Sequence, residues 1–537
     1  MGQQHSRRSR SLSGSQRSRL GSSERSRERG GLSRTKSVHE NLVRERGKKV
    51  LIEDVYEVVG KIGHGALCEI YKLQKNKDKI GGSSRPELQR KKVLDFGRFL
   101  SYNDTMKLRK EESFQLNPLY FALKVINLKK VKEDKIDQLK NEIELLRTMD
   151  HMNIIKAYET FQDKASKKLM IVMELCTGGD LYERLPYSEE QAATIAKQIL
   201  SAVSYMHQRN IIHRDIKMEN VIYESKQPDA LIKLIDFGLS KEYDSSQKDL
   251  FSERVGTLYS MSPETMKGAY DEKADLWSIG VCIYILLAAG HKPFDGKDPK
   301  ELVQKVLKAD YNFESPESWN SISLMAKTFI NSLLVVDPAK RPSAKKACNH
   351  EWIRSFAVVE HASDDLKRSV RKALIRYANF GSFRRLALNV IAKRSTSDEI
   401  FHLRKVFQEF DMLNTGTLTL RVFEGALLSL NVSSEEIAKI FKSLDVNRND
   451  AVNFTEFLAA CLEAQGDLAE YRIAEAFDLL DFDDTGYITR DNLRKLLGGY
   501  SSENYIDRLL AEAGSNGKIS YKDFLNVFAD QMPRRRS

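Results

Sequence analysis

The sequence of 537 residues is poor in cysteine and has no long apolar run. Its five cysteines show no paired spacing, which argues against a disulfide framework or a zinc site and suits a reducing compartment. The longest apolar run, IGVCIYILLAAG from Ile279, has 12 residues, whereas a membrane-spanning helix needs about 20. We therefore predict a buried helix there. The chain opens without a secretory apolar segment, so we expect no export signal. The cysteines are Cys68, Cys176, Cys282, Cys348 and Cys461.

The first 50 residues are also poor in apolar side chains and are rich in serine and arginine. They carry 14 Lys and Arg against 4 Glu, a net charge of +10, whereas the whole chain carries +11. Such a segment buries too little apolar surface to fold. We therefore predict a disordered basic leader over residues 1–50.

The leader begins with MGQQHS, which matches the M-G-x-x-x-[ST] pattern for myristoylation of Gly2. One myristoyl chain binds membranes only marginally, and a polybasic segment supplies the second signal that stable anchoring needs. A nucleic-acid-binding arm is the other common interpretation of a basic segment. We favour a cytoplasmic protein attached peripherally to a membrane surface, and we expect no nucleic acid partner.

Residues 445–456 read DVNRNDAVNFTE and match an EF-hand calcium loop. Ca²⁺ prefers about seven oxygen ligands, which such a loop presents at positions 1, 3, 5, 7, 9 and 12. Position 6 holds Asp450 instead of the usual glycine, and Asp tolerates the left-handed backbone needed there. Apolar residues at helical spacing on both sides predict flanking helices, whereas a polar surface loop is the alternative. The expected ligands are Asp445, Asn447, Asn449, the Ala451 carbonyl, Asn453 and Glu456.

Similar windows begin at Asp411, Asp481 and Glu512, so that successive loops are 34, 36 and 31 residues apart. This regular spacing predicts four EF-hands with loops at 411–422, 445–456, 481–492 and 512–523.

The other three loops have weaker ligand sets. The first has Leu413 and Val422 at ligand positions, and we expect no metal there. The fourth begins with Glu512 and Gly514 and ends in the short Asp523, so we also expect it to be structural. The third ends in a neutral amide and should bind Ca²⁺ weakly through Asp481, Asp483, Thr485, the Tyr487 carbonyl, Thr489 and Asn492.

The middle of the chain holds two motifs that phosphoryl transfer requires together. In IIHRDIKMEN, Asp215 is placed to accept the proton of an attacking hydroxyl, Lys217 to neutralise the transferred phosphate and Asn220 to hold Mg²⁺. In IDFGLS, Asp236 binds the Mg²⁺ that bridges the phosphates.

Further motifs stand in the matching order along the chain. YFALKVI predicts a strand that ends in Lys124, and KNEIELL places Glu142 on the following helix, so that the two side chains pair and hold the phosphates. Downstream, Arg341 in DPAKRPS is the expected buried partner of Glu264 in SPE. Each short motif is weak alone, but their shared order and spacing strongly indicate phosphoryl transfer.

On these motifs, residues 56–353 resemble the protein kinase family. With four EF-hands behind them, the chain is similar to the calcium-dependent protein kinases known from plants and protists. The resemblance implies an α+β fold, in which a bilobal protein kinase fold precedes an all-α calmodulin-like domain at 399–537. Residues 354–398 are similar to the junction segment of that family, and an insertion lies at about 74–118.

The resemblance also implies the residues that contact ATP. The G-x-G-x-x-G pattern falls on Gly63, Gly65 and Cys68, so its third glycine is missing. We expect Cys68 to be a tolerated substitution, and a redox switch is the alternative. The implied ATP contacts are Ile62, Gly63, Gly65, Ile70, Lys124, Glu142, Met173, Glu174, Cys176, Asp180 and Asp236.

The target is expected to be a serine or threonine, because DIKxEN and Thr257 in GTLYS resemble the serine/threonine kinases. Asp180 and Glu219 match acidic positions that often receive a basic residue upstream of the target hydroxyl. Activation with or without phosphorylation between Asp236 and Glu264 is compatible with the sequence.

The expected function is that of a calcium-activated serine/threonine protein kinase that uses ATP, Mg²⁺ and Ca²⁺. The junction is basic and amphipathic, and we expect it to hold the catalytic domain inactive at low Ca²⁺ until the opened hands capture it. A catalytically dead, calcium-responsive membrane scaffold is the alternative, supported by Cys68 and the poor loops.

Overall fold

The computed structural model describes residues 44–46, 52–64, 68–75, 120–131 and most of 136–529. Within the last range, the longer stretches left out are 244–250, 252–255, 357–361 and 498–501. All described residues belong to one compact unit, Lys36–Ser537. Gly2, nearly all of the insertion and most of the leader lie outside the described residues.

The first part of the kinase region is a six-stranded sheet in the order β1-β5-β6-β4-β3-β2. Its pairs are antiparallel except β1 and β5, which run parallel. Edge-to-face contacts join Phe121 to Tyr56 and Tyr158, each with ring centroids 5.5 Å apart, and form a small aromatic core. The strands are β1 (Arg44–Arg46), β2 (Tyr56–His64), β3 (Cys68–Lys75), β4 (Tyr120–Asn127), β5 (Ala157–Asp163) and β6 (Lys168–Met173).

Two predicted boundaries differ from the structure. Strand β4 continues to Asn127, because it pairs with β6 up to Lys168, and so the predicted end at Lys124 is wrong. Three residues of the leader, Arg44–Arg46, pair with β5, so the predicted disorder does not extend to them.

The second part of the kinase region is mainly helical. Helix α4 (Glu189–His207) begins with a capping box between Ser188 and Gln191 and packs on α6 (Lys273–Leu287) and α9 (Ala344–Cys348). Helix α6 is buried from Ala274 onward, which confirms the buried helix predicted at the longest apolar run. The remaining elements are β7 (Ile211–Ile212), β8 (Val221–Tyr223), β9 (Ile232–Leu234), β10 (Lys241–Glu242), α5 (Pro263–Lys267), α7 (Pro299–Lys308), α8 (Leu324–Leu333) and α10 (Glu351–Ser355).

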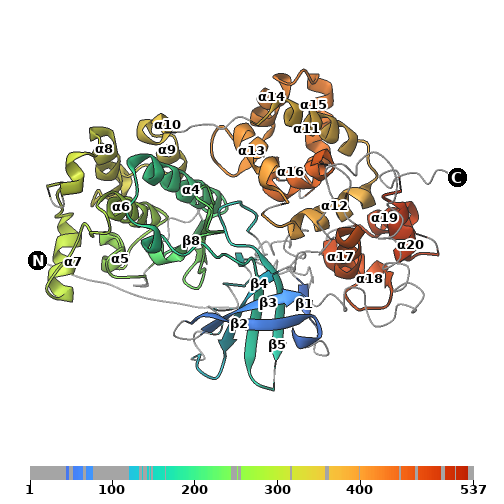
Figure 1. Ribbon diagram of the computed structural model, residues 1–537, viewed down its shortest axis with the longest axis horizontal. Coiled ribbons are helices and arrows are strands. Elements are labelled where there is room, and N and C mark those ends of the chain that lie inside the picture. Colours follow the sequence, from blue (N-terminus) through green and yellow to red (C-terminus); the bar gives the residue numbers. More distant parts are fainter. Residues whose placement is uncertain are drawn as a thin grey trace, which may run out of the picture. The chain divides into compact units, whose positions relative to one another are not determined.

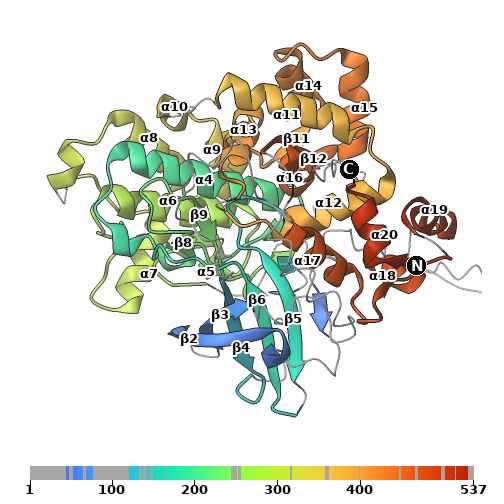
Figure 2. The ribbon, with the colours of Figure 1, turned by 45° about the vertical axis from the view of Figure 1, so that its right-hand side comes forward.

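The junction forms two helices, α11 (Asp364–Tyr377) and α12 (Ser382–Arg394). The buried face of α11 carries Val370, Ala373, Leu374 and Tyr377, which are spaced as one side of a helix. Helix α12 packs against helices of both EF-hand pairs, namely α16, α17 and α19 (Figures 1 and 2).

The EF-hand region is all helical apart from short strands in the loops. Strands β11 (Thr417–Thr419) and β12 (Ala451–Asn453) pair the first two loops, and β13 (Tyr487–Ile488) and β14 (Ile519–Ser520) pair the last two. The four predicted hands therefore form two pairs. Their helices are α13 (Phe401–Phe410), α14 (Leu420–Leu428), α15 (Ser434–Leu444), α16 (Phe454–Cys461), α17 (Glu470–Leu480), α18 (Arg490–Leu497), α19 (Glu503–Ala513) and α20 (Tyr521–Asn526).

Among the described residues, no helix combines the length and the apolar character that crossing a bilayer requires.

Candidate active site and calcium-binding loops

Two carboxylates from distant parts of the sequence, those of Glu142 and Asp236, lie close to Lys124. This residue lies in the middle of β4, between Ile70 on β3 and Ile171 on β6. Its Nζ is 2.5 Å from Glu142 Oε1 and 3.6 Å from Asp236 Oδ1. Burial alone would favour a neutral lysine, but the two carboxylates outweigh it and raise the pKa of Lys124 above its ordinary value. We call Lys124, Glu142 and Asp236 the nucleotide clamp.

The backbone at Asp236 is unusual and brings its carboxylate to the clamp. Asp236 has a φ of +64°, and the amide of Gly238 donates a 3.4 Å hydrogen bond to Asp236 Oδ1. Burial alone would raise the pKa of Asp236, but Lys124, His213, the Gly238 amide and Lys217 together outweigh burial and hold this pKa below the ordinary value. The side chain is 49% exposed, so its charged carboxylate is available to hold Mg²⁺.

The catalytic loop, residues 211–220, and Thr257 together hold the Asp215 carboxylate. Lys217 Nζ donates to Asp215 Oδ2 at 2.8 Å, Asn220 Nδ2 to the same oxygen at 2.9 Å, and Thr257 Oγ1 to Oδ1 at 2.8 Å. Lys217 Nζ also donates to Thr257 Oγ1 at 2.9 Å. Asn220 uses its amide nitrogen in these bonds, so the amide oxygen is the atom that fits Mg²⁺. The structure thus brings the three predicted catalytic residues together.

Asp275 of helix α6 supports the catalytic loop, a role that no sequence motif predicted. Asp275 is 1% exposed, and its carboxylate accepts the backbone N–H of His213 at 3.0 Å and of Arg214 at 2.9 Å. These bonds hold Arg214 at a φ of +69°, directly before Asp215. Burial alone would raise the pKa of Asp275, but the hydrogen bond from His207 and the neighbouring charges keep it low. A lone carboxylate in an otherwise apolar helix was the available signal.

Glu264 and Arg341 form the buried pair that the sequence predicted. Arg341 Nη1 and Nη2 lie 2.5 and 2.7 Å from the two carboxylate oxygens of Glu264. Such a two-point pair joins helix α5, which carries Glu264, to the segment after Pro338–Lys340, which carries Arg341.

The phosphate loop is only partly described. Gly63 lies opposite Ile70 in the β2–β3 register, and Cys68 is the first residue of β3. Ile62 is 51% exposed on β2. Gly65, the second glycine of the pattern, lies outside the described residues.

The segment after β6 carries the predicted adenine contacts. Met173 ends β6, and the amide of Glu174 donates to the Lys156 carbonyl at 2.9 Å. The backbone group that Glu174 offers to a base is therefore its carbonyl. The Glu174 side chain pairs with Lys233 at 2.8 Å, and burial raises the pKa of the Cys176 thiol, so that it stays protonated.

The two acidic residues predicted to contact substrate have protein partners. Asp180 Oδ1 accepts the backbone N–H of Tyr182 at 2.8 Å, and Glu219 Oε2 accepts the hydroxyl of Tyr259 at 2.6 Å. Both carboxylates have further acceptor capacity for a basic side chain.

The second EF-hand loop is closed by its own carboxylates. Asp445 accepts the backbone N–H of Asn449 and of Asp450, each at 3.0 Å, and Asp450 has the predicted left-handed backbone, with a φ of 59°. Glu456 is fully buried and accepts the N–H of Val446 at 3.1 Å through Oε1. Its Oε2 accepts the N–H of Asn453, which is position 9 of the loop, at 2.8 Å. These converging oxygens fit Ca²⁺, and Asn447 lies outside the described residues.

The same loop contacts the kinase region, and the sequence did not predict this contact. Asn453 Oδ1, predicted as a ligand through water, accepts from Arg209 Nη2 at 3.0 Å. Thr455 Oγ1 donates to Asp150 Oδ1 at 2.6 Å. No local sequence pattern points to these partners, because they stand 244 and 305 residues away.

In the first and third loops, hydrogen bonds within the loop form the turn, although not every ligand position carries a metal ligand. In the first loop Asp411 is 5% exposed, and burial raises its pKa to about 7, although the Thr415 and Gly416 amides partly offset this. In the third loop Asp481 accepts the backbone N–H groups of Thr485 and Gly486, and Asn492 Oδ1 accepts the N–H of Thr489 at 2.7 Å.

The fourth loop uses its first residue for another purpose. The Glu512 carboxylate accepts the backbone N–H groups of Ser382 and Phe383, each at 2.9 Å, and so caps the first turn of junction helix α12. This contact agrees with the prediction that the fourth loop is structural.

Comparison with known proteins agrees with this geometry. The protein kinase domain family matches residues 114–353, and the EF-hand domain pair matches residues 400–462 and 470–529. Calcium-dependent protein kinase 5 of Plasmodium falciparum is 35% identical over 424 residues, which cover 76% of this chain and 72% of the relative. Calcium-dependent protein kinase 4 of Plasmodium berghei is 36% identical over 433 residues, which cover 76% and 81%. The chain belongs to the calcium-dependent protein kinase family.

This calcium-dependent protein kinase transfers phosphate from ATP to serine or threonine, with Mg²⁺ in the kinase site and Ca²⁺ in the EF-hands. When bound, Mg²⁺ neutralises phosphate charge, and the chain's own groups do the rest. Lys124 is placed to hold the phosphates, and Asp215 is placed to orient the hydroxyl and accept its proton. The alternative of a dead scaffold is not favoured, because the described catalytic residues are assembled.

Proposed function

We propose that Ca²⁺ activates this kinase by moving the junction from a blocking position into the EF-hand region. The observation that carries the proposal is the environment of α11 and α12. Val370, Leu374 and Tyr377 of α11 are fully buried and share one apolar core with the EF-hand helices. An amphipathic helix held in this way cannot at the same time cover the catalytic site.

The state of the catalytic site supports the same proposal. In the structure with a captured junction, the nucleotide clamp is closed between Lys124 and Glu142 at 2.5 Å. Arg404 at the start of the EF-hand region pairs with Glu224 of the kinase region at 2.7 Å. Capture of the junction and an aligned active site thus occur together, as a calcium-activated arrangement requires.

Labelled-phosphate transfer to a basic serine peptide, with Mg²⁺ and ATP, tests the proposal across a Ca²⁺ titration. Leu374→Asp places a charge in the apolar core and should strongly reduce Ca²⁺-stimulated activity. Lys372→Ala, on the exposed side of the same helix, is the matched control and should respond like the unaltered protein. Full Ca²⁺ stimulation of Leu374→Asp would show that capture of α11 is not the activating step.

We also propose that the substrate carries a basic residue upstream of its target hydroxyl. Two acidic side chains, Asp180 and Glu219, support this preference. Glu219→Gln should weaken the selection of an arginine-bearing peptide over its glutamine counterpart, seen as a smaller ratio of their kcat/KM values. An unchanged ratio would remove Glu219 from substrate recognition.

We further propose that the kinase is cytoplasmic and attaches to membranes through a myristoylated Gly2 and the basic leader. The support is the sequence MGQQHS and the leader's net charge of +10.

A further inference from the structure

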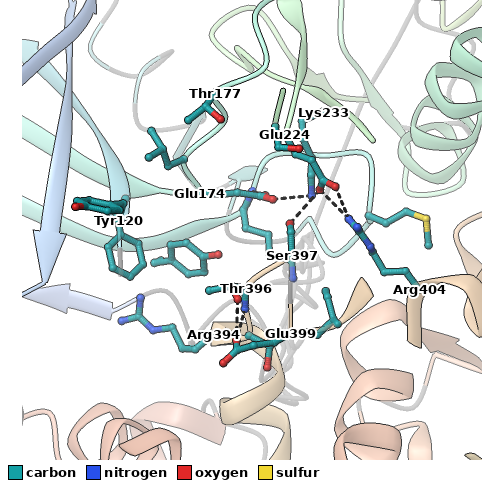
Figure 3. Close-up of a pocket in the computed structure, with 18 of the residues that line it drawn as sticks. Tyr120, Glu174, Thr177, Glu224, Lys233, Arg394, Thr396, Ser397, Glu399 and Arg404 are labelled. Carbon is teal, nitrogen blue, oxygen red and sulfur yellow. Dashed lines mark hydrogen bonds and ion pairs between the residues drawn. The ribbon is translucent and has the colours of Figure 1, made fainter. Parts of the chain in front are cut away.

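A cavity of about 520 Å³ lies between kinase segment 174–177 and the end of the junction, residues 394–400 (Figure 3). Other wall residues come from β3, β4, β5, β9, α13, α16 and α17. Neither Asp215 nor any residue of the nucleotide clamp lines it. The cavity is therefore distinct from the phosphoryl-transfer site.

Most charged side chains of the wall are paired. Six basic and three acidic side chains line the cavity. Lys233 pairs with Glu174 at 2.8 Å, and Arg404 pairs with Glu224 at 2.7 Å, as Figure 3 shows. The other ion pairs are Lys75 with Glu475, Arg472 with Glu399 and Arg394 with Glu159.

One cationic group of the wall lacks an acceptor. Lys156 lines the cavity and is 5% exposed, and its Nζ makes no hydrogen bond or ion pair with any described residue. Arg394 also lines the cavity, but its Nη2 pairs with Glu159, and its Nη1 is shielded from solvent, so this nitrogen does not face the cavity.

Leaving this group without an acceptor is costly. A buried polar group without a partner costs free energy, and a buried charge costs more. Burial lowers the pKa of Lys156 to about 8, and Glu174 offsets this fall only in part. An oxyanion in the cavity would supply the missing acceptor and would favour the charged lysine.

The rest of the wall includes flat apolar side chains. Phe121, Tyr158 and Phe454 line the cavity, and the Arg394 guanidinium lies 5.0 Å from the centroid of the Tyr158 ring. Ligand sites of about 300–1,000 Å³ commonly combine such surfaces with a few polar groups. The wall therefore suits a ligand with one anionic end and a flat apolar body.

We propose that this cavity binds a small organic anion, namely a phosphate monoester with a flat apolar body. The phosphate accepts a hydrogen bond from Lys156 Nζ, because a dianion is a strong acceptor for a buried ammonium group. The apolar body lies against the aromatic side chains of the wall.

Phenyl phosphate is the probe, and its binding to the full chain is measured by isothermal titration calorimetry. Ca²⁺ is present, and a saturating non-hydrolysable ATP analogue with Mg²⁺ fills the kinase site. Inorganic phosphate tests the anion alone, and phenol tests the apolar body alone. We expect saturable binding of phenyl phosphate, with both fragments binding more weakly.

The Lys156 variants test the cationic wall. Lys156→Gln should weaken binding of phenyl phosphate by about tenfold or more, whereas Lys156→Arg should largely preserve it. Lys129→Gln, at an exposed lysine, is the charge-matched control and should leave binding unchanged. Thermal unfolding without probe checks the fold, and Lys156→Gln should be at least as stable as the unaltered chain, because it removes an unpaired buried cation.

A second variant fills the cavity and leaves Lys156 in place. Thr177 lines the cavity and is exposed, so Thr177→Trp should place its ring in the ligand space and abolish binding. No saturable binding of phenyl phosphate would overturn the proposal, and so would unchanged binding in Lys156→Gln or Thr177→Trp. Phenol binding as tightly as phenyl phosphate would overturn the role of the anion.

Discussion

Replacing Glu456 with Gln tests which EF-hand loop controls the enzyme. The two Glu456 carboxylate oxygens accept backbone N–H groups from within the loop, at 3.1 Å from Val446 and 2.8 Å from Asn453. Gln has one acceptor oxygen, and its NH₂ cannot accept an N–H. One bond to a charged acceptor is lost, which we expect to cost about 1.5–3 kcal/mol. Calorimetric unfolding in chelator should therefore show a lower midpoint for the EF-hand region.

The same change should weaken the response to Ca²⁺. Glu456 is the only position-12 residue among the four loops that is a glutamate, and its two oxygens supply the bidentate ligand of an EF-hand. Loss of one oxygen and of the charge should raise the Ca²⁺ concentration for half-maximal kinase activity by about ten- to hundredfold. The assay is phosphate transfer to a serine peptide across buffered Ca²⁺ concentrations.

The matched control is Asp523→Asn, the equivalent change in the fourth loop. Asp523 accepts the Ser520 amide at 3.0 Å, but the first residue of that loop, Glu512, is already engaged in capping α12. This variant should move the Ca²⁺ midpoint much less, and Asp481→Asn in the third loop should shift it without removing the response. An unmoved titration for Glu456→Gln, together with loss of the response in the first or fourth loop, would refute this ranking.

Three further outcomes are expected. Asp215→Asn should lower phosphate transfer by about 10²–10⁴-fold while nucleotide still binds, because the nucleotide clamp is intact; substantial turnover at saturating ATP would contradict the role of Asp215. Gly2→Ala should release the protein from vesicles in moderate salt, because the basic leader alone supplies a screened attraction, and unchanged co-sedimentation would exclude acylation as the anchor. Glu512→Ala should lower the thermal midpoint of the EF-hand region, because capping the Ser382 and Phe383 amides contributes about 0.5–2 kcal/mol, whereas an equal midpoint would show that water replaces the cap.

The parts of the site that could be predicted lie within short stretches of chain. Asp215, Lys217 and Asn220 fall within six consecutive residues, and the second calcium loop within twelve. Their relative positions follow from local backbone geometry, so residue type and spacing carry the information. Boundaries were less predictable, since the end of β4 at Asn127 depends on the length of its pairing partner β6.

The sequence by itself therefore determined the domain order and the four hands, and it predicted the catalytic residues and the ranking of the ligand sets. Tertiary structure alone decided that Asp275 holds the catalytic loop, that Glu512 caps the junction and that Lys156 and Arg394 line one cavity. These contacts join residues that are far apart along the chain and that belong to no shared local pattern. Their partners are selected by burial, because a buried charge or amide must find whichever complementary group the packing brings near.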